Sequence, residues 1–386
     1  MQLKNKISLA AATLLVSSSL MAENYFSLQY IQYDESDDRV SISTPSMEIS
    51  KDIGVDYTFK VGLTSDTLSG GSPVWNDKRE MDASSGASNH TRNRNVDSSN
   101  VQYTKANYEE DRTAVATSLT TRFASRDELT VGLNYSSEND YEARELSAEY
   151  MHYLDGSKNQ SITAGLSYQN NEVEVPCYED SECDVSSGGS EYRDVSVVAA
   201  EVGYMQVLDA NAFAKASLFL TSEDGYLSNP YMNVVRSRTD NANYDVVAER
   251  KPDTRVSYGA TMQYTRALTP NVSSNTMYRF YSDDWDIQSH TINTEMYYEY
   301  GSTWVFGAGL RYYTQSEAEF YKAGYFSTQK YASSDERVRD FDAVGYKFST
   351  DYKHTKNLTL NLGINYYDQK DTFNATYYNI GLKYYF

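Results

Sequence analysis

The chain has 386 residues and a formal net charge of −20, with 37 tyrosines against 13 phenylalanines and 3 tryptophans. So acidic a chain lacks the broad basic face that binding to nucleic acid requires, and beyond its N-terminus it has no apolar run of about 18 residues, which excludes a helical membrane protein. A soluble fold of this length would need about two or three hydrophobic cores, for which 40% hydrophobic residues is little material.

The first 22 residues have the pattern of a secretory signal peptide. Two lysines precede an apolar stretch over 7–20, and the small residue Ala22 follows at the expected cleavage site. The apolar stretch is short for a helix that spans a bilayer. We therefore predict that residues 1–22 are removed on export and that residues 23–386 form a single domain.

Apolar and polar residues alternate along most of the remaining chain. The clearest series reads Ile53, Val55, Tyr57, Phe59, Val61 and Leu63. A period of two indicates strands with one apolar face, and segments of about 10 to 15 residues are long enough to cross a bilayer at a tilt. We predict sixteen strands, over 24–34, 39–50, 53–65, 110–123, 128–139, 141–154, 160–172, 191–207, 212–224, 254–267, 272–283, 288–301, 303–317, 340–354, 357–368 and 373–386.

The second of these strands breaks the alternation near Pro45. Its apolar residues change parity from Val40 and Ile42 to Met47 and Ile49. A bulge at Pro45 would explain both the change and the missing N–H donor. If this segment does not pair, the barrel has fourteen strands.

All the long connections between the predicted strands fall on one side of the series, and every connection on the other side is short. The short ones lie at 50–52, 124–127, 155–159, 208–211, 268–271, 301–302 and 355–356, and the long ones at 66–109, 173–190, 225–253 and 318–339. Outer-membrane barrels have short periplasmic turns and long external loops. The fold we predict is therefore all-β: a transmembrane antiparallel up-and-down β-barrel of about sixteen strands, in the bacterial outer membrane.

Two features mark the external loops. The 66–109 loop begins with a Gly-Gly turn motif, which either folds the loop back over the pore or serves as a flexible connection. The motif consists of Ser69, Gly70, Gly71, Ser72 and Pro73. Cys177 and Cys183 share another loop, where an exported chain is expected to form a local disulfide; a redox or metal-binding pair is the alternative.

The tyrosine surplus has a place in such a barrel. Seven tyrosines near the ends of lipid-facing series predict an aromatic girdle at the headgroups, namely Tyr135, Tyr168, Tyr204, Tyr264, Tyr312, Tyr346 and Tyr366. Others have inward parity, among them Tyr281, Tyr297, Tyr313, Tyr367 and Tyr385.

Charged residues of inward parity are the candidates for lining the lumen. They are Lys60, Glu145, Glu149, Glu201, Lys215, Arg279, Glu295, Glu299, Arg311, Lys347 and Lys383. Opposed acidic and basic strips would orient polar solutes. Alternatively, four residues on consecutive strands neutralise one another as cross-strand pairs, namely Arg279, Glu295, Glu299 and Arg311.

Residue patterns for catalysis and metal binding are weak. The four histidines, His90, His152, His290 and His354, fall on unrelated segments, and there is no HExxH pattern or phosphate loop. Acidic stretches at 34–38, 109–111, 179–184 and 283–286 lack the regular ligand spacing of a calcium loop. We therefore expect no enzyme, no cofactor and no specific metal site.

The last strand ends on an alternating aromatic and apolar series, Tyr378, Ile380, Leu382, Tyr384 and Phe386. A terminal Phe with apolar residues at every second position resembles the signal that the outer-membrane barrel assembly machinery recognises. This series predicts insertion by that machinery.

Three blocks near the N-terminus carry a family resemblance: 38–45 (DRVSISTP), 49–54 (ISKDIG) and 66–73 (DTLSGGSP). They resemble a domain-of-unknown-function family of bacterial outer-membrane proteins. The resemblance implies the fold and the location, and it implies no activity. Members of the family are often encoded near exported thioredoxin-like and flavin-attaching proteins, which implies an envelope redox or maturation pathway.

These patterns leave two functions open. The first is a porin-like channel or transporter for small polar solutes, with a lumen narrowed by the 66–109 loop. The alternative is a non-conducting surface or assembly protein whose loops bind a partner in an exported pathway. The expected partners are outer-membrane lipid and lipopolysaccharide, the assembly machinery, small polar solutes and an exported redox protein, with no nucleic acid.

Overall fold

The computed structural model describes residues 24–71, 73–77, 93–105, 108–177, 189–238, 243–326 and 329–386. The predicted signal peptide, Ser72, His90 and Cys183 lie outside these residues. Among the described residues, no helix has the length and apolar character needed to cross a membrane.

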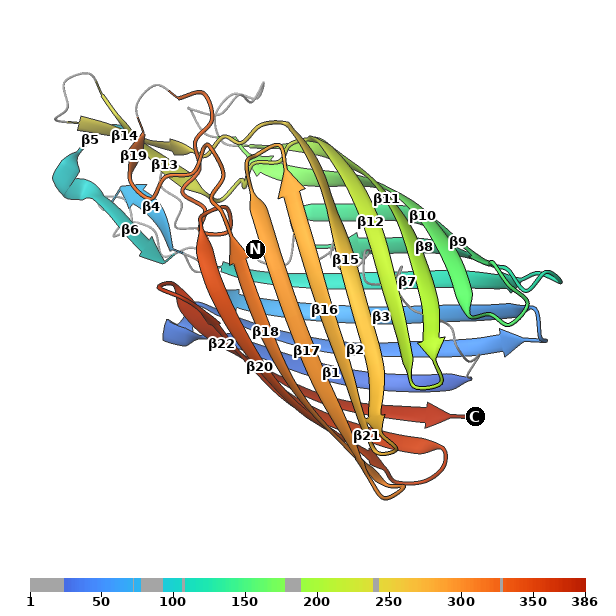
Figure 1. The fold of residues 1–386 in the computed structure, drawn as a ribbon. Coiled ribbons are helices and arrows are strands. Elements are labelled where there is room, and N and C mark those ends of the chain that lie inside the picture. The colour runs from blue at the N-terminus through green and yellow to red at the C-terminus, as the bar shows by residue number, and fades with distance from the viewer. Residues whose placement is uncertain are drawn as a thin grey trace.

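Sixteen strands form a closed barrel in which each pairs antiparallel with its neighbours in the chain, and β1 closes the ring with β22 (Figure 1). Each predicted strand corresponds to one of them. Their bounds are β1 (Tyr25–Glu35), β2 (Val40–Ile53), β3 (Tyr57–Gly70), β7 (Tyr108–Arg122), β8 (Glu128–Ser137), β9 (Tyr141–Tyr153), β10 (Gln160–Pro176), β11 (Ser190–Asp209), β12 (Ala212–Gly225), β15 (Thr254–Thr269), β16 (Val272–Asp283), β17 (Gln288–Tyr300), β18 (Trp304–Gln315), β20 (Phe341–Lys353), β21 (Leu358–Gln369) and β22 (Phe373–Tyr385).

The outer face of the barrel carries the apolar residues of the alternating series. Leu133, Leu166 and Leu218 are 58%, 57% and 67% exposed, as expected of side chains that face lipid rather than a protein core. All seven tyrosines predicted for the aromatic girdle are exposed on the same face. The alternation therefore reports the two faces of the barrel wall.

The two ends of the barrel differ in their connections. At the turn end, short turns join β2 to β3, β7 to β8 and each following pair, and the C-terminus lies there too, where the Tyr385 N–H donates to Asn357 O (2.7 Å). The first of these turns was predicted at 50–52, which is four residues too early. Lys51 and Asp52 belong to β2, and the chain turns at 54–56, where Gly54 has φ +67°.

Pro45 does not mark a bulge or a missing strand. Ser43 lies opposite Thr67 and Ser46 opposite Thr64, so the β2–β3 register is the same on both sides of the proline. The expected bulge is wrong because the parity change has another cause: Val40 and Ile42 point into the barrel. There they pack with Tyr33, Leu68 and Ala375 in a small apolar cluster.

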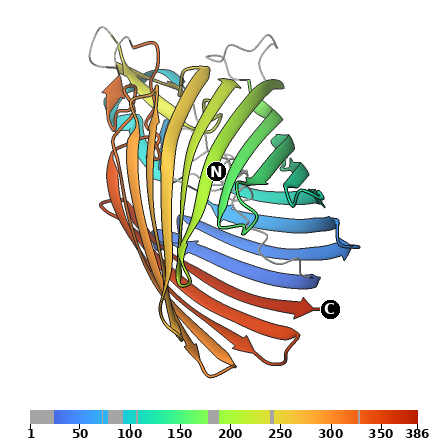
Figure 2. The same ribbon diagram turned by 45° about the vertical axis from the view of Figure 1, so that its right-hand side comes forward.

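The loop end carries six further strands in two sheets. They are β4 (Pro73–Asp77), β5 (Asn93–Asp97), β6 (Val101–Lys105), β13 (Asn233–Ser237), β14 (Asn243–Ala248) and β19 (Tyr325–Phe326), beside the short 3-10 helices η1 (Ser36–Asp38) and η2 (Ser98–Asn100). One sheet has the order β19-β13-β14-β5, and β4 pairs with β6. We call the described residues of 71–107, 226–253 and 316–340 the cap. It lies at the end of the barrel away from the C-terminus (Figures 1 and 2).

The cap has its own core. Val234, Val235 and Val246 are fully buried, and the Asn233 Nδ2 donates to Trp75 O (2.8 Å), which links β13 to β4. Three connections that are far apart in the sequence therefore fold as one unit on the barrel.

Candidate functional site

The inner wall of the barrel is polar. Arg311, for example, lies between the lipid-facing Leu310 and Tyr312 on β18, and the same alternation places all eleven predicted lumen residues on inner positions. Their placement agrees with the predicted parity. Which of them act on a solute remains a prediction.

One ion pair crosses three strands of this wall. The Lys347 Nζ lies 3.1 Å from the Glu295 Oε1, although β18 separates their strands. Gly309 of β18 stands between them, and a Cβ there would lie 3.2 Å from the Glu295 Cγ and 3.3 Å from the Lys347 Cβ. The glycine leaves the space through which the two side chains meet.

The expected mutual neutralisation of Arg279, Glu295, Glu299 and Arg311 is therefore wrong for Glu295. The register places Glu295 opposite Gly309, and Arg311 opposite Asn293, so no arginine of this set faces a glutamate of the set directly. Within the described residues, Arg279 and Arg311 have no carboxylate in ion-pair contact.

Carboxylates gather on another part of the wall. Glu145 of β9 accepts a hydrogen bond from the Asn134 Nδ2 (2.9 Å). Glu149, also of β9, lies within electrostatic range of Glu201 of β11 and of Lys215 of β12. The inner wall thus has an acidic side on β9–β11 and an arginine side on β16–β18.

Aromatic rings accompany the two arginines. The Arg279 guanidinium carbon lies 4.5 Å from the centre of the Phe219 ring, and that of Arg311 lies 6.0 Å from the Tyr313 ring. Phe219 in turn lies over Gly259, where a Cβ would meet the Phe219 Cζ at 2.4 Å. Such contacts hold the planes of the guanidinium groups.

A buried ion network closes the cap. The Lys251 Nζ lies 3.1 Å from both the Glu249 Oε1 and the Asp335 Oδ2, and all three side chains are almost fully buried. Burial by itself would raise the pKa of the Asp335 carboxyl, but the cations of Arg337 and Lys251 hold that pKa well below its usual range. The network joins the 226–253 connection to the 316–340 connection, and we call it the latch.

The cap is held to the barrel rim at separated points. Arg39, before β2, forms an ion pair with Glu336 of the cap (2.8 Å). Tyr231 of the cap donates its hydroxyl proton to Asp140, between β8 and β9, and Trp285, between β16 and β17, packs on Phe320 with ring centres 5.1 Å apart. Because these strand pairs are distributed around the ring, the cap spans the mouth of the barrel.

Glycine sets the direction of two cap connections. Gly70 ends β3 with φ +96°, and a Cβ there would lie 2.2 Å from Arg39 O; the next N–H, of Gly71, donates to the same oxygen (2.5 Å). Gly225 ends β12 in the same way, with φ +121° and a Cβ position 2.1 Å from Asp194 O. The motif that begins at Ser69 therefore forms a defined turn at the end of β3. The equivalent role of Gly225 was not predicted from the sequence, because Gly225 is a single glycine without a motif around it.

The remaining predicted residues fall on both ends of the barrel. Cys177 is buried just after β10, where its N–H donates to Gly189 O (2.9 Å); its partner Cys183 lies outside the described residues, so the disulfide stays a prediction. The C-terminal series Tyr378, Ile380, Leu382, Tyr384 and Phe386 follows the outer face of β22. Of the histidines, His152 contacts Asp127 near the turn end (2.9 Å) and His290 stacks on Tyr278.

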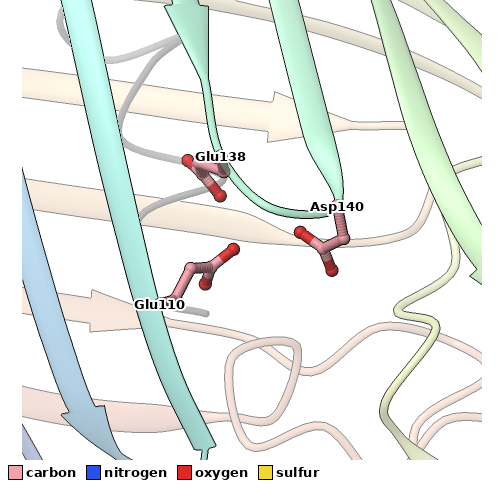
Figure 3. Close-up of side chains that lie close together, drawn as sticks. All are labelled: Glu110, Glu138 and Asp140. Carbon is pink, nitrogen blue, oxygen red and sulfur yellow. The ribbon is translucent and has the colours of Figure 1, made fainter.

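An acidic cluster lies near the loop end, where Glu110 of β7 approaches Glu138 and Asp140 of the β8–β9 turn (Figure 3). One carboxylate oxygen from each lies within 4.8 Å of the others. The sequence singled out the segment around Glu110 but not its two companions, which are distant in the chain. Asp140 is buried and the other two residues are half-buried, and we assign no ligand to the cluster.

The closed ring, the lipid-compatible outer face and the polar interior together define an outer-membrane type of β-barrel. The chain belongs to the family described as a protein of unknown function, DUF3570, whose sequence profile matches residues 4–382. This confirms the family resemblance carried by the N-terminal blocks.

Solved structures resemble this chain at low sequence identity. CdiB from Acinetobacter baumannii is 10% identical with a TM-score of 0.51, over 94% of this chain and 60% of that chain. The monoaromatic hydrocarbon channel CymD is 9% identical (TM-score 0.46, 97% and 93% covered), and the Pseudomonas putida toluene transporter TodX is 10% identical (TM-score 0.43, 97% and 93% covered). A comparison with curated protein sequences found no match to this chain.

Proposed function

We propose that this protein is an outer-membrane channel for small polar solutes, with the turn end in the periplasm and the cap at the cell surface. The observation that carries the proposal is the charged inner wall, with acidic and arginine sides, beneath a cap that spans the mouth. Side chains of both signs facing water suit polar solutes better than hydrocarbon.

In this proposal the cap is the gate. The 66–109 loop contributes β4, β5 and β6, but the other two connections complete the sheets, and the latch lies between those two. Loss of the latch would free the mouth without removing any barrel strand.

Conductance in planar bilayers tests the proposal. Lys251→Met leaves the buried Glu249 and Asp335 without their shared cation, at a cost of about 3–5 kcal/mol to the closed cap. We expect the wild-type barrel to give small or infrequent conductance steps, and Lys251→Met to give larger or more frequent ones.

The matched control is Arg238→Met in the same connection, because the Arg238–Asp245 ion pair is exposed and such pairs contribute about 0–1 kcal/mol. It should conduct like the wild type. A folded Lys251→Met barrel that never conducts would refute the channel proposal.

A second candidate is a non-conducting surface or assembly protein whose cap binds a partner of an exported redox or maturation pathway. The ordered cap with its own buried core favours it. Co-purification of a stoichiometric exported protein with the wild type, but not with Lys251→Met, would support this role. Intact output of the pathway in a deletion strain would exclude it.

Biogenesis completes the proposal. Residues 1–22 direct export, the outer face of β22 is read by the barrel assembly machinery, and outer-membrane lipid and lipopolysaccharide surround the wall. We also propose that Cys177 and Cys183 form a disulfide, that the chain acts by passage rather than by catalysis, and that it needs no cofactor.

A further inference from the structure

Two guanidinium groups on the inner wall stand without a carboxylate partner among the described residues. Arg279 faces Thr261 and Thr291 on its two neighbouring strands, so nothing directly beside it carries a charge. Arg311 likewise faces Asn293 and Gly345. Neutral, mostly small neighbours leave both positive charges turned toward the lumen.

Other inner-wall cations contrast with these two. Lys347 is paired with Glu295 (3.1 Å), and near the loop end Arg255 is paired with Asp283 (2.6 Å). The carboxylate within electrostatic range of Arg279 is Glu201, which β12 and β15 separate from β16. The wall thus neutralises several cations and leaves this pair available.

The pair lies close enough to act on one ligand. Arg279 and Arg311 are within electrostatic range of each other, and only β17 lies between their strands. Neighbouring strands are about 4.8 Å apart, so two extended arginine side chains can converge on a single group. Arg311 is also exposed to the lumen.

Aromatic rings frame the pair on both sides. Phe219 lies under Arg279 and stacks on Tyr281, with ring centres 6.5 Å apart. Tyr313 lies beside Arg311, and Tyr367 is within electrostatic range of it. Guanidinium forks bind carboxylates in two-pronged fashion, and aromatic faces bind the apolar faces of rings.

We propose that Arg279 and Arg311 form a subsite that binds the carboxylate of a ring-bearing organic acid while Phe219, Tyr281, Tyr313 and Tyr367 contact its ring. The subsite rests on the proposed channel function and names the class of solute. The acidic strands β9–β11, which carry Glu149 and Glu201, lie beyond β12 and β15 on one flank of the pair, and their negative charges repel an anion that leaves the arginines.

Calorimetric titration of the refolded full-length barrel with four probes tests the subsite. Benzoate carries ring and charge, glucuronate carries a sugar ring and charge, benzamide lacks the charge, and acetate lacks the ring. We expect benzoate or glucuronate to bind at least about tenfold more tightly than benzamide and acetate, since one charge-assisted contact is worth about that factor. The tighter of the two acids identifies aromatic acids or sugar acids as the solute.

The double variant Arg279→Gln/Arg311→Gln should weaken binding of the preferred acid about tenfold or more. Arg279→Lys/Arg311→Lys, which keeps the charge but loses the fork, should weaken it less. The matched control is Arg266→Gln, an exposed arginine on the outer face of β15, which should bind like the wild type.

If neither benzoate nor glucuronate binds the wild type more tightly than benzamide and acetate do, the subsite is overturned even if no variant folds. Arginine variants that bind within about twofold of the wild type would overturn it as well. The conductance of the same preparations is measured independently of binding. A barrel that conducts without arginine-dependent binding refutes the subsite alone, and arginine-dependent binding without conductance refutes the channel alone.

Discussion

Single glycines decide local geometry at three places in this barrel. Gly309 lets Glu295 and Lys347 meet across an intervening strand, Gly259 accommodates the Phe219 ring, and Gly70 brings the chain against the Arg39 carbonyl. In each case the missing side chain creates a contact between other residues. Glycine at these positions therefore has a structural reason beyond flexibility.

We expect Gly70→Ala to destabilise the barrel more than Gly54→Ala. Both positions have positive φ, which costs alanine about 1–2 kcal/mol, but a Cβ at Gly54 meets open space whereas one at Gly70 lies 2.2 Å from a backbone oxygen. The clash raises the cost at Gly70 by a further amount, about 1 kcal/mol or more. Denaturant unfolding in detergent micelles measures both, and equal losses would contradict the clash.

At the scale of elements, the cap is a second folding unit that the barrel supports. Its strands come from three connections, its sheets share buried valines, and its latch holds two connections together. Its anchors to the rim are side-chain contacts and single backbone hydrogen bonds, such as that from the Glu319 N–H to Trp285 O (3.1 Å), rather than shared strands. Cap and wall can therefore differ in stability.

The latch gives the cap a pH dependence of definite sign. Arg337 and Lys251 depress the pKa of the Asp335 carboxyl. The stability that the ionised Asp335 gives to the folded cap is therefore fully present above the ordinary aspartate pKa of about 3.9, and it is lost progressively as the pH falls below that value. Hydrogen exchange, corrected for intrinsic rates, should show that residues 226–238 and 329–340 open faster at pH 3 than at pH 6. The barrel strands should show little change.

Asp335→Asn is the control for this effect. It removes the titrating group and leaves Lys251 with Glu249, so its cap should be weaker at neutral pH and should lose less on acidification. A wild-type cap that exchanges equally at both pH values would contradict the role of the latch.

For the whole molecule, closure of the ring depends on the last strand. β22 pairs with both β21 and β1, and the Phe386 N–H donates to Asn24 O (3.1 Å) beside the seam. The Phe386 side chain itself faces outward and is 52% exposed. We therefore expect its ring to serve recognition by the assembly machinery more than packing.

We expect Phe386→Ala to lower the amount of folded barrel in cellular outer membranes severalfold while the purified chain refolds in detergent with the wild-type yield. The reason is that this substitution removes the proposed assembly signal but removes few contacts within the protein. Tyr300→Ala removes another exposed outer-face aromatic ring near the turn end and should leave cellular yield unchanged. Equal effects of the two substitutions would argue against a C-terminal signal.

Much of the fold was predictable because lipid and water lie on opposite sides of one wall. Every second residue of a strand must suit one of them, so parity located the girdle tyrosines and the inner charges. Because all the long connections fall on one side, the number of strands was predicted to be even and close to sixteen. The prediction was wrong in the strand over 40–53, where Val40 and Ile42 pack inside the barrel, because parity does not distinguish lipid from an inner apolar cluster.

The class of fold, the two faces of the wall and the family could be predicted from the amino-acid pattern alone. The cap, the latch, the partner of Glu295 and the placing of the Arg279–Arg311 pair beside Phe219 and Tyr313 required the three-dimensional structure. These features join residues that are distant in the chain, and their contacts depend on register and on closure of the ring. Local patterning carries no information about either.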